Sequence, residues 1–150
     1  MYTNILVSTD GSDIARKGVE HGIALAKALA AKATVVTVTE PMLIDYGSGF
    51  ASGYIPSQAE VDRFEVSSKE FAGKVLDEVR EAAGQMGISA EFLHIPDAYP
   101  AKAIIETAKS RGCDLIVMAS HGRRGIRRFL LGSQTSEVLA DGSVPVLVVR

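Results

Sequence analysis

A glycine- and arginine-rich segment in the last third of the chain contains residue types that bind anions. It runs from Ser120-His121-Gly122 to Gly132-Ser133, and its four arginines give residues 121–130 a local charge of +4. Glycines let backbone N–H groups approach an anion, and a helix N-terminus adds unpaired N–H donors and a favourable dipole. The segment therefore predicts a phosphate site, with a solvated surface loop as the alternative. The helix start that follows adds the hydroxyls of Ser133, Thr135 and Ser136.

Asp10 is a second candidate because it follows the first apolar run, Ile5-Leu6-Val7. In an open parallel sheet, ligands bind beyond the carboxyl ends of the strands, where the strand order reverses. A carboxylate at that place can accept hydrogen bonds from ribose hydroxyls. The alternative is that Asp10, or Ser12, only caps the helix that follows.

Other motifs for nucleotide chemistry are missing from the sequence. There is no G-x-x-x-x-G-K-[ST], and no G-x-G-x-x-G follows the first apolar run. The glycines from Gly47 to Gly53 have a different spacing, and we interpret residues 41–56 as a flexible loop. This loop is longer than the roughly 12–15 residues at which a connection without secondary structure becomes unusual.

Few residues are placed for catalysis or metal binding. His21 and His94 have no further ligand at a suitable spacing, and Cys113 has no adjacent base, so we expect all three to be structural. His121 is either a ligand contact or a residue that holds its loop by hydrogen bonds. We therefore predict no catalytic residue and no metal site formed by protein ligands alone.

The elements that must position these residues alternate between short apolar runs and helical patterns. Buried strands alternating with helices favour an α/β fold with a doubly wound parallel sheet and helices on both faces, as one domain over residues 1–150. In the first helix, Gly18 and Gly22 lie on the apolar stripe and predict close packing on the sheet. The expected strands cover residues 4–8, 34–39, 89–95, 114–119 and 144–149, and the expected helices cover 13–31, 57–86, 101–110 and 133–140.

Composition narrows the class of protein further. The chain has 150 residues, 47% of them hydrophobic, one cysteine and a net charge of −2. A near-balanced charge argues against nucleic acid as a partner, and one cysteine suits a reducing compartment. No apolar run approaches the ~20 residues that span a bilayer, and residues 1–7 do not resemble a signal peptide. We expect a cytoplasmic protein with no membrane segment.

The last apolar run predicts a partner for the sheet. Residues 144–149 are apolar on both faces, and if this last strand forms an edge of the sheet, one of its sides is left unpaired. A twofold copy of the same strand would cover that edge. We therefore predict a homodimer through Val144, Pro145, Val146, Leu147, Val148 and Val149.

Together these segments resemble the universal stress protein family over the whole chain. The start, Ile5-Leu6-Val7-Ser8-Thr9-Asp10-Gly11-Ser12, is similar to the family's first strand and acidic turn. The family's nucleotide-binding members carry G-x2-G-x9-G-[ST] after the fourth strand. Here Gly122 and Gly132-Ser133 match it in identity and spacing, and Ala119 replaces the first glycine. Pro145-Val146-Leu147-Val148-Val149 also resembles the family's ending.

The resemblance implies a strand order of 3-2-1-4-5 and a site between the first and fourth strands. It implies ATP with Mg²⁺ as the ligand, Asp10 on the ribose, the Val38 backbone on adenine, and phosphates held at Gly132 and the three residues after it. The nucleotide-binding residues that it implies, together with His121, are Thr9, Asp10, Val38, Met118, Ala119, His121, Gly122, Arg123, Gly132, Ser133, Gln134 and Thr135.

Three functions remain open from the sequence. The first is an ATP-binding protein of stress response or signalling, which acts through nucleotide-dependent conformation or partners. The second is a slow ATPase or a nucleotidyl-transfer enzyme of the same fold. The third is a dimeric interaction module with a vestigial pocket, a reading that the Ala119 substitution favours.

Overall fold

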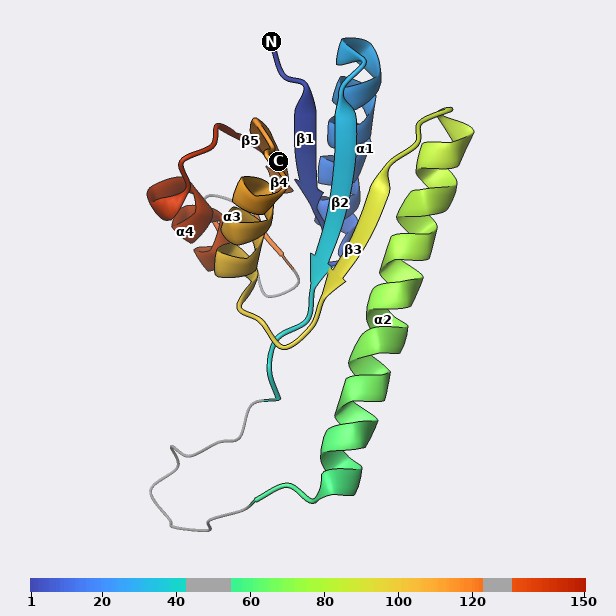
Figure 1. Ribbon diagram of the computed structural model, residues 1–150, viewed down its shortest axis with the longest axis vertical. Helices are drawn as coiled ribbons and strands as arrows, with labels where there is room; N and C mark the ends of the chain where they lie inside the picture. Colours follow the sequence, from blue (N-terminus) through green and yellow to red (C-terminus); the bar gives the residue numbers. More distant parts are fainter. Residues whose placement is uncertain (43–54, 123–130) are drawn as a thin grey trace.

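Five parallel strands form one sheet in the order β3-β2-β1-β4-β5 (Figure 1). This arrangement comes from a computed structural model, which describes residues 1–42, 55–122 and 131–150. It confirms the expected fold class and strand order. The strands are β1 Asn4–Ser8, β2 Lys32–Val38, β3 Glu91–Ile95, β4 Leu115–Ala119 and β5 Val146–Val149.

Helices cover both faces of this sheet, as the doubly wound fold requires. The helices are α1 Asp13–Leu29, α2 Gln58–Gln85, α3 Pro100–Ser110 and α4 Ser133–Asp141. Helices α1 and α2 pack on one face, and α3 and α4 pack on the other (Figure 1). The first half of α2 extends past the ends of β2 and β3, and its buried residues all lie in the second half, from Ala72 to Ala83.

The expected element bounds differ from the observed ones at a few ends. Helix α1 ends at Leu29 and not at residue 31, because Ala30 turns into the left-handed region with φ 51°. Strand β2 begins earlier than expected, at Lys32, whose N–H donates to the Thr3 carbonyl at 2.9 Å. Strand β5 begins at Val146 and not at residue 144, because Pro145 has no N–H to donate to a ladder. Most of the expected loop 41–56 lies outside the described residues.

Alternating side chains of the strands form two apolar clusters, one on each face. In β1, Ile5 and Val7 point toward α1 and α2, whereas Leu6 points toward α3 and α4. In β4, Leu115 and Val117 share the first face. All five of these side chains are buried, so each face of the sheet is part of the core.

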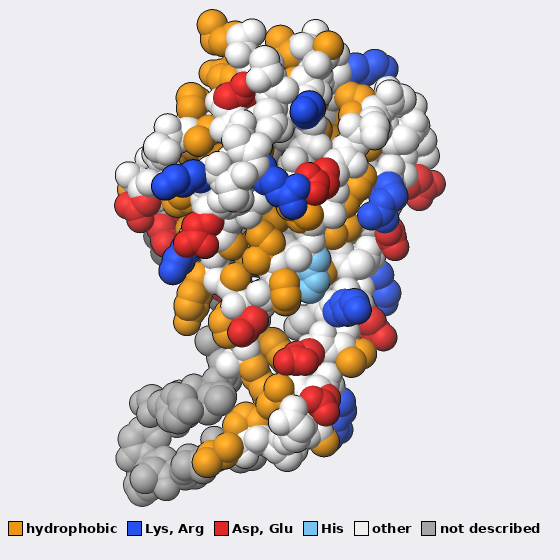
Figure 2. Space-filling view, viewed as in Figure 1, with side chains coloured by type: hydrophobic (Ala, Val, Ile, Leu, Met, Phe, Trp, Pro, Cys, Tyr) orange, Lys and Arg blue, Asp and Glu red, His pale blue; other side chains and the backbone are white. Residues whose placement is uncertain are grey.

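Charged side chains of both signs are mixed over the outer surface. Figure 2 shows acidic and basic side chains interspersed on one face of the molecule. No helix among the described residues combines the length and hydropathy that a bilayer span needs.

Two glycines let α1 lie unusually close to the sheet, as the sequence predicts. A methyl group added at Gly18 would lie 3.2 Å from the backbone nitrogen of Ala119. One added at Gly22 would lie 2.6 Å from Cγ2 of Val7, whose side chain is fully buried. These contacts set the distance between α1 and strands β1 and β4.

We predict that Gly22→Ala destabilises the protein by about 1–3 kcal/mol, because Val7 is stiff and has no free space to move into. Gly73→Ala is the matched control, since Gly73 lies within α2 and nothing stands within 4 Å of its added methyl. The free energy of unfolding of that control should rise by about 0.5–1 kcal/mol, because alanine has a higher helix propensity than glycine. Urea unfolding of the two variants tests this, and equal stabilities would contradict the packing argument.

The amino ends of β1 and β4 are joined by one carboxylate. Asp114 accepts hydrogen bonds from the Thr3 backbone N–H at 2.8 Å, the Thr3 hydroxyl at 2.8 Å and the Asn4 N–H at 3.0 Å. The Thr3 backbone bond, with help from the other donors, lowers the pKa of Asp114. A lowered pKa means that the unfolded chain binds this proton more tightly than the folded chain does.

The stabilisation from Asp114 should therefore be complete above the ordinary aspartate pKa of about 3.9 and should disappear as the pH falls below it. We predict that Asp114→Asn is less stable than the parent protein near neutral pH, and that the difference narrows below about pH 4. Thermal unfolding of both proteins from pH 7 to pH 2.5 measures this difference. A constant difference across the range would show that the carboxylate charge contributes nothing.

Candidate functional site

The turn after β1 and the segment after β4 lie side by side at the carboxyl ends of these strands. Strands β1 and β4 pair directly, with Val7 opposite Val117. Gly122 lies against the carboxylate of Asp10, because a methyl added at Gly122 would be 2.6 Å from Asp10 Oδ2. The two sequence candidates, 112 positions apart, are thus in contact at the switch point of the sheet.

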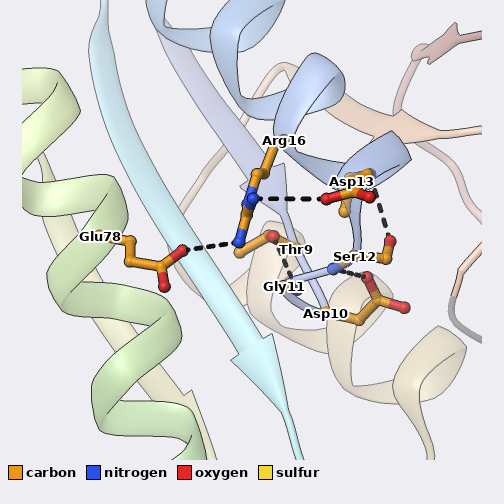
Figure 3. Close-up of polar contacts among 8 residues, drawn as sticks. Thr9, Asp10, Gly11, Ser12, Asp13, Arg16 and Glu78 are labelled. Carbon is orange, nitrogen blue, oxygen red and sulfur yellow. Dashed lines mark hydrogen bonds and ion pairs between the residues drawn. The ribbon is translucent and has the colours of Figure 1, made fainter.

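The turn that holds Asp10 is fixed by its own hydrogen bonds (Figure 3). The Ser12 N–H donates to Asp10 Oδ1 at 3.0 Å, and the Gly11 N–H donates to the Thr9 hydroxyl at 3.2 Å. Ser12 caps α1, since its hydroxyl accepts from the Ala15 N–H at 3.2 Å. Of the two capping residues considered from the sequence, Ser12 is the helix cap, and Asp10 orders the turn.

Helix α2 presses on this turn from the other side. A methyl at Gly11, which has φ +78°, would lie 2.7 Å from Val75 Cγ2 of α2. Arg16 of α1 pairs with Asp13 at 3.3 Å and with Glu78 of α2 at 3.2 Å. In Figure 3 the carboxylate of Asp10 points away from the Arg16–Glu78 pair. Arg16 therefore contacts α2, whereas Asp10 lies beside Gly122.

The start of α4 lies beside the end of β4. The Gly132 N–H donates to the Ser120 carbonyl at 2.8 Å, and a methyl at Gly132 would lie 3.4 Å from His121 Cα. The start of α4 is thereby placed beside the end of β4 and close to Gly122, whose nitrogen lies 3.9 Å from the same methyl position. The second and third glycines of the sequence motif are therefore neighbours in space.

Helix α4 starts without a side-chain cap. Its N-cap residue is Gly132, which has no side chain that could accept from the first N–H groups. By contrast, Ser12 caps α1, and the Glu60 carboxylate accepts from the Ser57 N–H at 2.9 Å at the start of α2. The first N–H groups of a helix need an acceptor and carry the positive end of its dipole. A ligand anion would supply that acceptor at Gly132.

Two side chains in the first turn of α4 form hydrogen bonds within the protein. The buried Thr135 hydroxyl donates to the Ala119 carbonyl at 3.0 Å. The Gln134 side-chain oxygen accepts from the Ala101 N–H at 2.8 Å, at the start of α3. With these two side chains engaged, the first-turn backbone N–H groups and the exposed Ser133 side chain remain for the predicted phosphate contacts, which stay predictions.

The methyl group of Ala119 lies on the α1 side of the sheet by strand alternation. Along β4, Leu115 and Val117 face α1 and α2, and Met118 faces α3 and α4, so alternation turns Ala119 toward α1. Its backbone is the part of β4 that Gly18 approaches. The extra methyl relative to glycine is thus accommodated against α1.

Val38 and Met118 lie on the opposite face, within the apolar cluster beneath α3 and α4. Met118 is buried and Val38 is partly exposed, and both stand near the carboxyl ends of their strands. This placement suits the predicted adenine contact. Arg123, which we also predicted in the site, lies outside the described residues.

His121 makes one hydrogen bond within the site. Its Nδ1 lies 2.9 Å from the Ser120 hydroxyl. Its Nε2 is buried and has no partner among the described residues. The first contact fits a role in holding the loop, and the second nitrogen fits a ligand contact, so both alternatives from the sequence stay open.

Ser120 is a residue of the site whose role the sequence did not predict. It is 2% exposed, its N–H donates to the Val149 carbonyl at 2.7 Å, and its carbonyl accepts from Gly132. One residue thus joins β4, the end of β5 and the start of α4. A small polar residue directly after a buried strand was the only signal for it.

The remaining histidines form local contacts. Nδ1 of His21 lies 2.8 Å from the Lys17 carbonyl, and Nε2 of His94 lies 2.8 Å from the Thr39 hydroxyl, so both are engaged within the protein. Burial, followed by the charge of Lys69, lowers the pKa of His94. Within residues 1–42, 55–122 and 131–150, no group of three histidine, cysteine or acidic side chains could hold a metal ion.

Comparison with known proteins agrees with this arrangement. Universal stress protein YxiE of Bacillus subtilis is 31% identical over 150 residues, which are 100% of this chain and 100% of that protein. The solved structure of MJ0577, a protein of Methanocaldococcus jannaschii, is similar with a TM-score of 0.82 and 25% identity, over 99% of this chain and 96% of that one. A universal stress protein in complex with cAMP has a TM-score of 0.72 and 25% identity, over 99% of this chain and 97% of that one.

The model of the universal stress protein family matches residues 1–150, the whole of the chain. The matched range includes the Asp10 turn, the segment that begins at Ser120 and the edge strand β5. This chain therefore belongs to the universal stress protein family.

Proposed function

We propose that this chain binds ATP with Mg²⁺ between the ends of β1 and β4, and acts in stress response or signalling through nucleotide-dependent conformation or partners. The observation that carries the proposal is the contact of Asp10 with Gly122 beside the uncapped start of α4. A carboxylate that can accept ribose hydroxyls and N–H donors that attract phosphate are thereby placed in one site. The related protein in complex with cAMP supports an adenine nucleotide as the ligand.

The site divides into a nucleoside end and a phosphate end. Thr9 and Asp10 would contact the nucleoside, with Asp10 on the ribose. The backbone of Val38 would contact adenine, and Met118 would line the pocket on the face beneath α3 and α4. Gly122 and the backbone from Gly132 to Thr135 would surround the phosphates. Mg²⁺ prefers oxygen ligands and keeps several waters, so it would be held by the phosphate oxygens and would neutralise their charge.

The position of Ala119 favours a working pocket over a vestigial one. Strand alternation turns its methyl group toward the α1 face of the sheet, where Gly18 lies against the Ala119 backbone. The Ala119 carbonyl still accepts the hydrogen bond from Thr135 that anchors α4. We therefore expect the methyl group of Ala119 to leave the phosphate end of the site open.

We predict that the purified protein binds ATP and that Gly132→Ala weakens this binding at least about tenfold, the equivalent of 1.4 kcal/mol. A methyl at Gly132 meets only ordinary contacts at 3.4 Å, so the variant should fold as the parent does. Any loss therefore reports the approach of a ligand and not damage to the protein. Calorimetric titration with ATP and Mg²⁺, with Tm as the check on folding, measures both.

Gly84→Ala is the control, because Gly84 has open space around it on α2, away from the site. The proposal is wrong if the parent protein binds no ATP at millimolar concentration, which would leave the vestigial-pocket alternative. Steady release of phosphate during the titration would instead favour the slow ATPase. Unchanged affinity in Gly132→Ala would place the nucleotide elsewhere.

We also propose that two copies of the chain pair through β5. This strand pairs only with β4, so its other edge has no strand beside it among the described residues. Leu147 is 39% exposed, and Val146 and Val148 are partly exposed. An apolar edge strand of this kind requires cover.

Leu147→Lys should convert the dimer into monomers, because the charge lies at the proposed interface and outside the core. Analytical ultracentrifugation gives the masses of the parent and of the variant. Leu139→Lys is the control, as Leu139 is 42% exposed on α4 and should leave the mass unchanged. A Leu147→Lys protein that still sediments as the parent dimer would refute the interface.

A further inference from the structure

The first turn of α4 is held from two directions by consecutive side chains. Thr135 reaches back to the Ala119 carbonyl at the end of β4, at 3.0 Å. Gln134 reaches across to the Ala101 N–H at the start of α3, at 2.8 Å. The first contact fixes the height of the helix start above the sheet, and the second fixes its direction relative to α3.

Only one assignment of donor and acceptor is possible for the hydrogen bond between Gln134 and Ala101. A backbone N–H is a donor, so the side-chain atom that faces it must be the amide oxygen. Helix α3 needs this acceptor, because its N-cap residue Tyr99 makes no side-chain cap and Pro100 has no N–H of its own. Ala101 is fully buried, so its N–H would otherwise lack both water and a partner.

We propose that Gln134 is a positioning residue for the phosphate end of the site, and that its side chain is not a phosphate ligand. This inference rests on the proposed nucleotide function. The Gln134 side chain stays on α3 and holds the N–H groups of the first turn of α4 at the place where the phosphates bind. The start of α3 and the phosphate site are thereby one rigid unit.

The proposal separates two parts of the binding energy. In the proposed site, the adenosine part depends on Asp10, the Val38 backbone and Met118, whereas the hydrogen-bond partner of the Gln134 side chain is Ala101 of α3. The phosphate part depends on the direction of the first turn of α4, which Gln134 sets. Removing the Gln134 oxygen should therefore weaken ATP binding and leave adenosine binding as it was.

The test is Gln134→Met, which keeps the length of the side chain and removes the oxygen. We expect the ratio of the adenosine Kd to the ATP Kd to fall about tenfold, as for the loss of one hydrogen bond that orients a site. Adenosine affinity should stay unchanged. Gln85→Met makes the same replacement at the exposed end of α2, and its ratio should equal that of the parent.

A second measurement needs no variant and separates positioning from direct contact. The hydrogen exchange of the Ala101 amide, followed by NMR, should be slow in the parent protein and should stay slow when ATP is added. Faster exchange with ATP would show that Gln134 leaves α3 for the phosphates and would overturn the proposal. A Gln134→Met protein with the parent's Kd ratio would overturn it as well.

These outcomes are distinct from a failure of the proposed function. If the parent protein binds neither ATP nor adenosine, the nucleotide proposal fails, and the positioning role fails with it. If the parent protein binds both ligands and Gln134→Met binds each of them with the parent's affinity, only the positioning role is wrong.

Discussion

Parallel pairing of β1 with β4 is the constraint on which the candidate site depends. It brings the turn after β1 against the segment after β4, so that Asp10 lies beside Gly122 although they are far apart in the sequence. A carboxylate against a backbone is tolerable there only because residue 122 has no side chain. The same pairing places the carbonyls of Ala119 and Ser120 where they can hold the start of α4. The strand order thus determines where the candidate site lies, and the side chains determine what it can contact.

Close approach, more than flexibility, explains the important glycines. Gly18 and Gly22 bring α1 onto the sheet, and Gly122 admits Asp10, each at a distance that a methyl group would violate or crowd. Gly132 differs, because a methyl at that position fits the protein alone. Under the proposed function, its lack of a side chain would let an anion approach the uncapped start of α4. Contacts within the protein therefore account for Gly18, Gly22 and Gly122, whereas the role of Gly132 rests on the proposed ligand.

The sequence predicted the strands and helices of the fold well because these elements depend on local signals. The apolar run of residues 4–8 and the Gly132-Ser133 helix start are local patterns, and β1 and α4 begin where those patterns begin. The sequence does not predict contacts between segments that are far apart in the chain. Nothing in the sequence around Gln134 indicates that its side-chain oxygen accepts a hydrogen bond from the start of α3, 33 positions earlier. A glutamine in a helix can as well lie on the exposed surface. For the same reason the sequence could not show that Gly18 packs against the backbone of Ala119.

The peptide unit between Ala119 and Ser120 connects the candidate site to the edge of the sheet. Its N–H, on Ser120, is bonded to the last residue of β5, while the two carbonyls next to it hold Thr135 and Gly132 at the start of α4. A displacement of α4 by a ligand must therefore act on the same short stretch of backbone that orders the end of β5. Coupling between two sites needs a rigid element that both contact, and it is reciprocal when it exists. Ala119 and Ser120 lie between the proposed phosphate site and the proposed dimer edge, and α4 and β5 also share the apolar cluster that contains Val138 and Val146.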